Sequence, residues 1–209
     1  MNNFNQEQLK HAVRTMSAGS CDGIDLDTAF HWVVEDIKSP SCFFEHLASL
    51  IPINSILYVE GTSINQEVAK CYESFRPRGV VAVKRDTVFP VPGIYHLGFS
   101  PEVATRLQEF ARLRPVEDLF DHIKAYHGET LLFTFHDAFV GSLRISECVP
   151  EMAVSEFCRI LKVSYLRQET KRRDPEHLRK LSEALEHPAQ INYACEPWWK
   201  RLMRQWTGK

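Results

Sequence analysis

The run SILYVEG at residues 55–61 decides the fold class, because it combines β-branched and aromatic residues and is closed by a glycine. That composition is typical of a β-strand. Beyond it the period changes, and apolar residues recur at every third or fourth position up to residue 75. Ser63 and Gln66 stand at the spacing of a capping box, which marks a helix start. Residues 55–75 are therefore expected to form a strand followed by a helix.

Further strands are predicted on the C-terminal side of this unit. GVVAVK at residues 79–84 is almost uniformly apolar, as expected for a strand inside a sheet that is covered on both faces. LLFTF at 131–135 and FVGSLRI at 139–145 are separated by three residues, which favours an antiparallel hairpin. The proline- and glycine-rich stretch 87–101 predicts a loop with at most a short edge strand at 93–97.

The N-terminal third is expected to be helical. Leu26, Phe30, Val33 and Ile37 recur at helical spacing, and Ser39 followed by proline is a start signal for a second helix. Later helices are predicted to open at Ser100, Pro115 and Pro150. We therefore expect an α/β or α+β body over residues 1–161, in which a mixed sheet of four to five strands, between residues 55 and 145, packs against helices.

A separate character is predicted for residues 162–209. This segment holds eleven Lys and Arg against six Asp and Glu, whereas residues 1–161 hold 14 against 21. We interpret it as a basic helical extension on an acidic body. Its last predicted helix carries three of the four tryptophans, Trp198, Trp199 and Trp206. Since tryptophan is rarely left in water, this helix is expected to pack on the body, on a second copy of the chain or on a partner protein.

The strand end Leu57–Gly61 supplies the sharpest local motif, with Glu60 directly before the glycine. It resembles the first motif of the Toprim domain of primases and topoisomerases, and the resemblance implies that Glu60 works beside a metal ion. The resemblance is confined to this strand end, and the Asp-x-Asp element of that family is absent. The structural alternative is a carboxylate that caps the following turn.

Two further groups are candidates for chemistry. His136 and Asp137 are adjacent in a predicted turn, where they could converge as a general base or half of a metal site, or serve only as turn residues. His96 and Asp86 fall near the ends of predicted strands, where sites in open sheets are usually built. The catalytic candidates are thus Glu60, Asp86, His96, His136 and Asp137.

Other classes of site lack their usual patterns. The sequence has no phosphate-binding glycine loop, dinucleotide fingerprint, nucleophile elbow or zincin motif, so no motif requires a cofactor and the metal is unspecified. The six cysteines stand singly, which is typical of reduced thiols. Without an apolar leader or a membrane-spanning run, the expected location is the cytoplasm.

Two hypotheses about function follow. The first is a binding or regulatory module that acts through protein–protein contacts, as a homo-oligomer or with a partner, by way of the tryptophan-rich helix. The second is a metal-dependent or His/Asp-based enzyme with its site at the strand ends, which requires at least three of the five candidates to share one cleft. Nucleic-acid binding by the basic extension is the less favoured alternative, since acidic residues dilute its positive charge.

Overall fold

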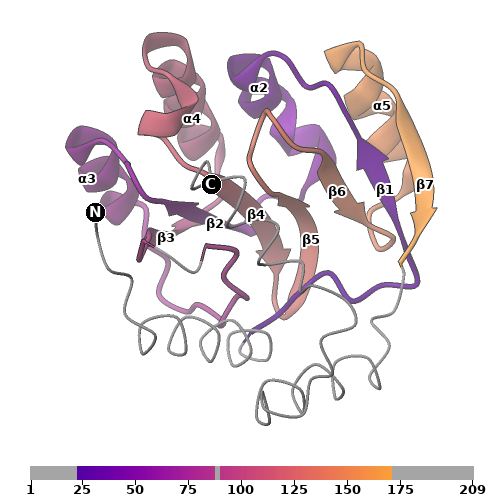
Figure 1. Cartoon of the computed structure of the whole chain (residues 1–209), viewed down its shortest axis with the longest axis horizontal. Helices are drawn as coiled ribbons and strands as arrows, with labels where there is room; N and C mark the ends of the chain where they lie inside the picture. The colour runs from indigo at the N-terminus through magenta and orange to yellow at the C-terminus, as the bar shows by residue number, and fades with distance from the viewer. Residues whose placement is uncertain (1–22, 88–89, 171–209) are drawn as a thin grey trace, which may run out of the picture. The chain divides into compact units, whose positions relative to one another are not determined.

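The described residues, 23–87 and 90–170 of the computed structural model, form one seven-stranded sheet with four α-helices (Figure 1). The strand order is β3-β2-β4-β5-β6-β1-β7, and every pairing is antiparallel. The strands are β1 Phe30–Val34, β2 Ile56–Gly61, β3 Gly93–Gly98, β4 His122–His127, β5 Thr130–Phe135, β6 Leu143–Ser146 and β7 Tyr165–Glu169.

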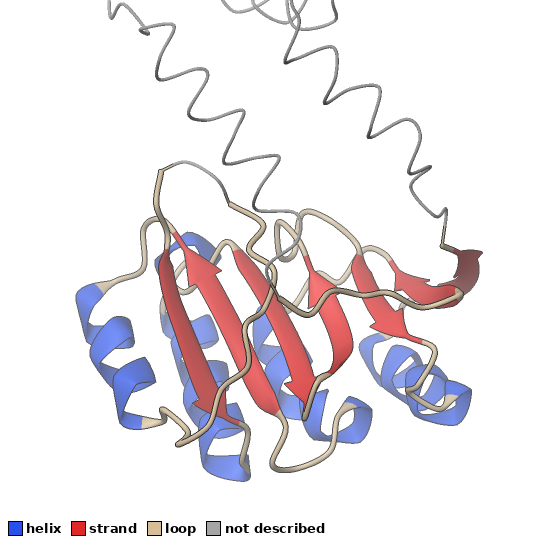
Figure 2. Ribbon diagram, turned by 90° about the horizontal axis from the view of Figure 1, so that it is seen from below, coloured by secondary structure: helices blue, strands red, loops and turns tan. Residues whose placement is uncertain are grey.

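The helices all lie on one face of the sheet, and irregular segments cross the other face (Figure 2). The helices are α2 Pro40–Leu50, α3 Gln66–Ser74, α4 Pro101–Leu113 and α5 Glu151–Leu161. Phe43 of α2 lies at the centre of the core on the helix side, in contact with the rings of Phe133, Phe135 and Phe157. No helix in the described ranges is both long enough and apolar enough to cross a bilayer.

The expectation of a mixed sheet of four to five strands is wrong, because the sheet has seven strands and every pairing is antiparallel. Residues 79–84, which were expected to form one of its strands, are not part of it. They run across the face opposite the helices, where Val81 and Val83 pack on a small second core that includes Tyr58 and Tyr126. Val83 forms an isolated parallel bridge with Ile24 there. Apolar runs are equally typical of a covering segment, since both uses bury the same side chains.

The predicted helix around Leu26 to Ile37 is also wrong, because its centre is strand β1. The sequence FHWVV is entirely aromatic, β-branched or histidine, a composition that suits a strand better than a helix. Trp32 and Val34 enter the helix-side core, and His31 and Val33 face the other way. The helical spacing joined residues from a strand and from the irregular segments on either side of it.

Strands β4 and β7 were not predicted. Pro115 precedes only a three-residue 3-10 helix, Val116–Asp118, after which the chain enters β4 instead of continuing as a helix. β7 lies within the segment that was expected to be a helical extension. The predicted tryptophan-rich helix, with Trp198, Trp199 and Trp206, falls outside the described residues.

Several predicted elements are confirmed. Ser39 and Ser100 cap α2 and α4, and each accepts a hydrogen bond from a backbone N–H of the first turn. Strand β2 and the edge strand β3 lie where expected, and α5 begins directly after Pro150. Helix α3 also forms, but Asn65 caps it in place of Ser63.

Candidate functional site

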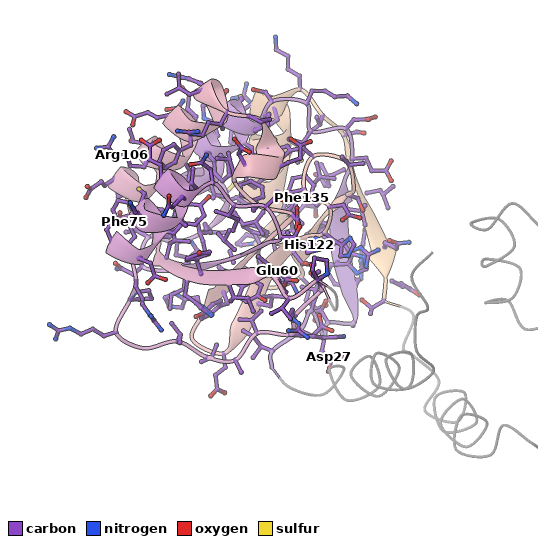
Figure 3. All side chains as sticks on the ribbon, turned by 60° about the vertical axis from the view of Figure 1, so that its left-hand side comes forward. Asp27, Glu60, Phe75, Arg106, His122 and Phe135 are labelled. Atoms are coloured by element: carbon purple, nitrogen blue, oxygen red, sulfur yellow. The ribbon has the colours of Figure 1, made fainter. Side chains whose placement is uncertain are left out.

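The candidate site lies on the face of β2 and β4 that points away from the helices. Alternation along β2 sends Leu57 and Val59 into the helix-side core and Tyr58 and Glu60 to the opposite face. Glu60 lies directly across the ladder from His122 of β4. Figure 3 shows these two residues together. Residues 79–87, here called the covering segment, pass over this part of the sheet.

Glu60 is completely buried and is the anchor of the covering segment. Its carboxylate accepts hydrogen bonds from the Tyr58 hydroxyl at 2.8 Å, the Asp86 backbone N–H at 3.1 Å and the Thr87 backbone N–H at 2.5 Å. Burial and the Glu60 carboxylate raise the pKa of Tyr58 far above its usual range, so the phenol remains a donor. Glu60 is therefore neither an exposed strand end nor a cap of the turn after β2.

A buried ion pair holds the same segment a short distance away. The Lys124 side chain is 2% exposed, and its Nζ donates to the Lys84 carbonyl oxygen at 2.6 Å and lies 3.0 Å from Asp86 Oδ2. A buried ammonium without such partners would be strongly destabilising. Asp86 is thus ion-paired with the buried Lys124 and helps to hold the covering segment on the sheet.

His122 has a defined protonation pattern. Its Nδ1 lies 2.9 Å from the backbone nitrogen of Asp137, and its Nε2 lies 3.0 Å from Thr87 Oγ1. Because a backbone N–H can only donate, Nδ1 must carry the lone pair and Nε2 the hydrogen. The imidazole is therefore neutral in this arrangement, and its Nε2–H donates to Thr87 Oγ1.

The turn at residues 136–141 carries the other two polar groups to His122. Asp137 and Phe139 have φ values of 45° and 69°, in the left-handed region. The Phe139 ring packs on Phe43 and Phe135, which ties the turn to the helix-side core. The His136 ring then stacks on His122 with centroids 4.3 Å apart and an interplanar angle of 27°.

His122, His136 and Asp137, here called the His–Asp cluster, converge at this turn. Asp137 Oδ2 lies 3.1 Å from His136 Nδ1, and Asp137 Oδ1 lies 3.7 Å from His122 Nδ1. One candidate ligand atom from each residue falls within 4.8 Å of the other two. His122 is buried, whereas His136 and Asp137 are exposed. The cluster therefore joins a fixed base to an edge that is open to solvent.

His96 belongs to a different part of the face. Its Nδ1 lies 3.0 Å from the Tyr126 hydroxyl oxygen, and its ring packs edge-on against Tyr58. Burial and the nearby Arg76 lower the pKa of His96. Tyr58 lies between His96 and Glu60, since its ring packs on His96 and its hydroxyl donates to Glu60. Among the described residues, no contact joins His96 to the His–Asp cluster.

The five predicted candidates thus divide into three places. Glu60 and Asp86 hold the covering segment, His136 and Asp137 form the exposed edge of the His–Asp cluster, and His96 packs between tyrosines. Sequence reasoning missed His122, Thr87 and Lys124. The alternation in HIKAYH, with polar or amphipathic residues at every second position, is the signal that predicts β4.

The described residues also line a shallow groove between α3 and α4, with Cys71, Phe75 and Arg106 at its sides. This groove lies away from Glu60 and His122 (Figure 3).

Neither a protein-family model, nor a curated protein, nor a solved structure matches this chain.

Proposed function

We propose that this protein is metal-dependent: it binds one divalent transition-metal ion through His122, His136 and Asp137, and the ion's remaining coordination positions receive a substrate or ligand. The observation that carries the proposal is the convergence of two imidazoles and a carboxylate within 4.8 Å. Three protein ligands with open positions are typical of catalytic metal sites, whereas structural zinc sites are closed by four.

The hydrogen bonds around His122 support this function. A metal-bound histidine usually donates its second ring N–H to an acceptor, which fixes the ring and its tautomer. His122 already has this arrangement, because Nε2–H donates to Thr87 Oγ1 and the Nδ1 lone pair points to the turn. Thr87 is in turn held by Glu60, so the buried face supplies a rigid support for the ligand.

The types of ligand atom also indicate which metal ions the site would bind. Imidazole with carboxylate suits zinc and iron(II), whereas magnesium and calcium prefer oxygen ligands alone. Ligands of a tetrahedral ion lie about 3.4 Å apart, so binding must draw the cluster inward from its present spacing. The ion must also take the Nδ1 lone pair from the Asp137 N–H, and the 136–141 turn is the part of the chain that has to move.

Calorimetric titration of the full chain with Zn²⁺, and visible absorption spectra with Co²⁺, test this function. We expect one saturable site per chain. His136→Gln and Asp137→Asn should each weaken binding by about tenfold or more, because each removes a ligand and leaves the sheet intact. Asparagine also tolerates the left-handed conformation of residue 137.

His127→Gln is the matched control, since this histidine is exposed at the end of β4 and lies outside the cluster. It should bind metal as the unmodified chain does. The proposal is overturned by absence of a saturable site, or by His136→Gln and Asp137→Asn binding unchanged while circular dichroism shows them folded.

A further inference from the structure

Strand β7 forms one end of the sheet and pairs with β1 along one side (Figure 1). Among the described residues no strand pairs with its other side. The Thr170 N–H donates to the Ala29 carbonyl oxygen, so the backbone groups of Leu166 and Gln168, which have the same parity, also face β1. The N–H and C=O groups of Tyr165, Arg167 and Glu169 therefore point away from β1, where no other described strand pairs with them.

The charges along β7 favour one register for pairing at that edge. Arg167 and Glu169 lie on the same face of the sheet, on either side of Gln168. If two copies of β7 pair antiparallel about Gln168, each Arg167 lies directly opposite Glu169 of the other copy. Pairing about Arg167 instead would place two arginines opposite each other, which is unfavourable.

We propose that β7 is a homodimer interface, in which two chains pair antiparallel about a two-fold axis at Gln168 and extend the sheet across the axis. The register spans residues 166–170 and gives two symmetric Arg167–Glu169 pairs, as a closed two-fold contact requires. β7 contains neither a proline nor a bulge, two of the devices that natural sheets use to prevent edge pairing, and its two charges are of opposite sign and can pair across the axis.

The opposite edge of the sheet does not offer the same complementarity. β3 reads GIYHLG and carries no pair of opposite charges that a self-pairing register could match. A second copy therefore fits β7 and not β3. Because a five-residue edge contact is small, the dimer should be weak and sensitive to salt. This inference is independent of the metal site, since none of the His–Asp cluster lies on β7.

Sedimentation of the full chain over a concentration series, at low and high salt, tests the interface. We expect a monomer–dimer equilibrium that shifts toward monomer as salt is raised. Arg167→Glu and Glu169→Arg should each weaken the dimer by about tenfold or more, because each places like charges opposite one another twice.

The charge-swapped double variant, Arg167→Glu with Glu169→Arg, restores both pairs and should dimerise again. Arg167 also stacks on the Phe30 ring at 3.8 Å. Arg167→Glu and the double variant both lose this contact of Arg167, so comparing these two variants isolates the cross-strand charges. Lys38→Glu, which reverses an exposed charge next to α2, is the control and should leave the dimer unchanged.

Three outcomes overturn the inference. A chain that remains monomeric at every concentration has no such interface. A dimer that Arg167→Glu and Glu169→Arg leave intact forms through another surface. Single variants that dissociate while the charge-swapped variant does not recover would show that this register is wrong.

Discussion

Glu60 is a carboxylate that is buried without an ion pair among the described residues. Its three donors are a hydroxyl and two backbone N–H groups of the covering segment. Charge-assisted hydrogen bonds of this kind offset part of the cost of removing a carboxylate from water. The same bonds fix residues 86 and 87, so one buried side chain determines how the covering segment lies on the sheet.

Glu60→Gln should lower the free energy of unfolding by about 1–3 kcal/mol, because in either orientation the new amide NH₂ faces the backbone N–H of Asp86 or Thr87, which can only donate. Urea denaturation followed by circular dichroism measures the change. Glu129→Gln, at an exposed position of the β4–β5 turn, is the control and should change stability by less than about 0.5 kcal/mol. An unchanged midpoint for Glu60→Gln would show that these hydrogen bonds do not contribute to stability.

Thr87 is the residue through which the buried face acts on the proposed metal ligand. Thr87→Val removes the acceptor of the His122 Nε2–H and should weaken metal binding about 10- to 100-fold. Thr87→Ser keeps the hydroxyl and should bind nearly as the unmodified chain does. Calorimetric titration with Zn²⁺ separates the two variants. Equal affinity in both would mean that Thr87 does not position His122.

Among the elements, the 136–141 turn joins the core to the site. Phe139 enters the aromatic cluster around Phe43. His136 and Asp137, which come just before it in the turn, lie against His122. Gly141 ends the turn and packs closely against the backbone of His136: a Cβ at this position would lie 2.3 Å from the His136 carbonyl oxygen. The turn therefore has little room to relax without moving His136.

Gly141→Ala should destabilise the protein by about 1–3 kcal/mol, because the added methyl group overlaps backbone atoms that cannot rotate away. Gly79→Ala is the matched control, since a Cβ there meets nothing within 4 Å. It should be neutral or slightly stabilising, as replacing a glycine reduces the entropy of the unfolded chain. Thermal unfolding of both variants makes the comparison, and similar melting temperatures would contradict the tight geometry of the turn.

The elements also show what the sequence could predict. Helices with a local start signal, at Ser39 and Ser100, lie where expected because the capping groups are neighbours in the chain. β1 and β4 were missed because their polar residues, such as His31 and Lys124, are buried in the folded protein, which the sequence pattern alone does not reveal. Likewise His136 and Asp137 could be chosen from the turn pattern, whereas His122 became recognisable only when the sheet register brought it to them.

At the largest scale, that of the described residues taken together, one sheet separates two cores of unequal size. The helix-side core contains most of the buried aromatic residues, and the smaller core lies between the sheet and the covering segment. The proposed metal site depends on both cores, because Phe139 anchors the turn on the helix side and Thr87 belongs to the covering segment. Whether the two cores unfold together therefore determines how independently the site can move.

We expect a single cooperative unit. Phe43→Ala should cost about 3–5 kcal/mol in the larger core, and Val83→Ala about 1.5 kcal/mol in the smaller one. Both variants should lower the urea midpoint without changing the slope of the transition, since each removes stability from the same folded state. Hydrogen exchange on Val83→Ala tests this expectation. Faster exchange confined to residues 79–87, with the sheet still fully protected, would contradict it. That outcome would show that the covering segment opens by itself and that Thr87 can leave His122 without global unfolding.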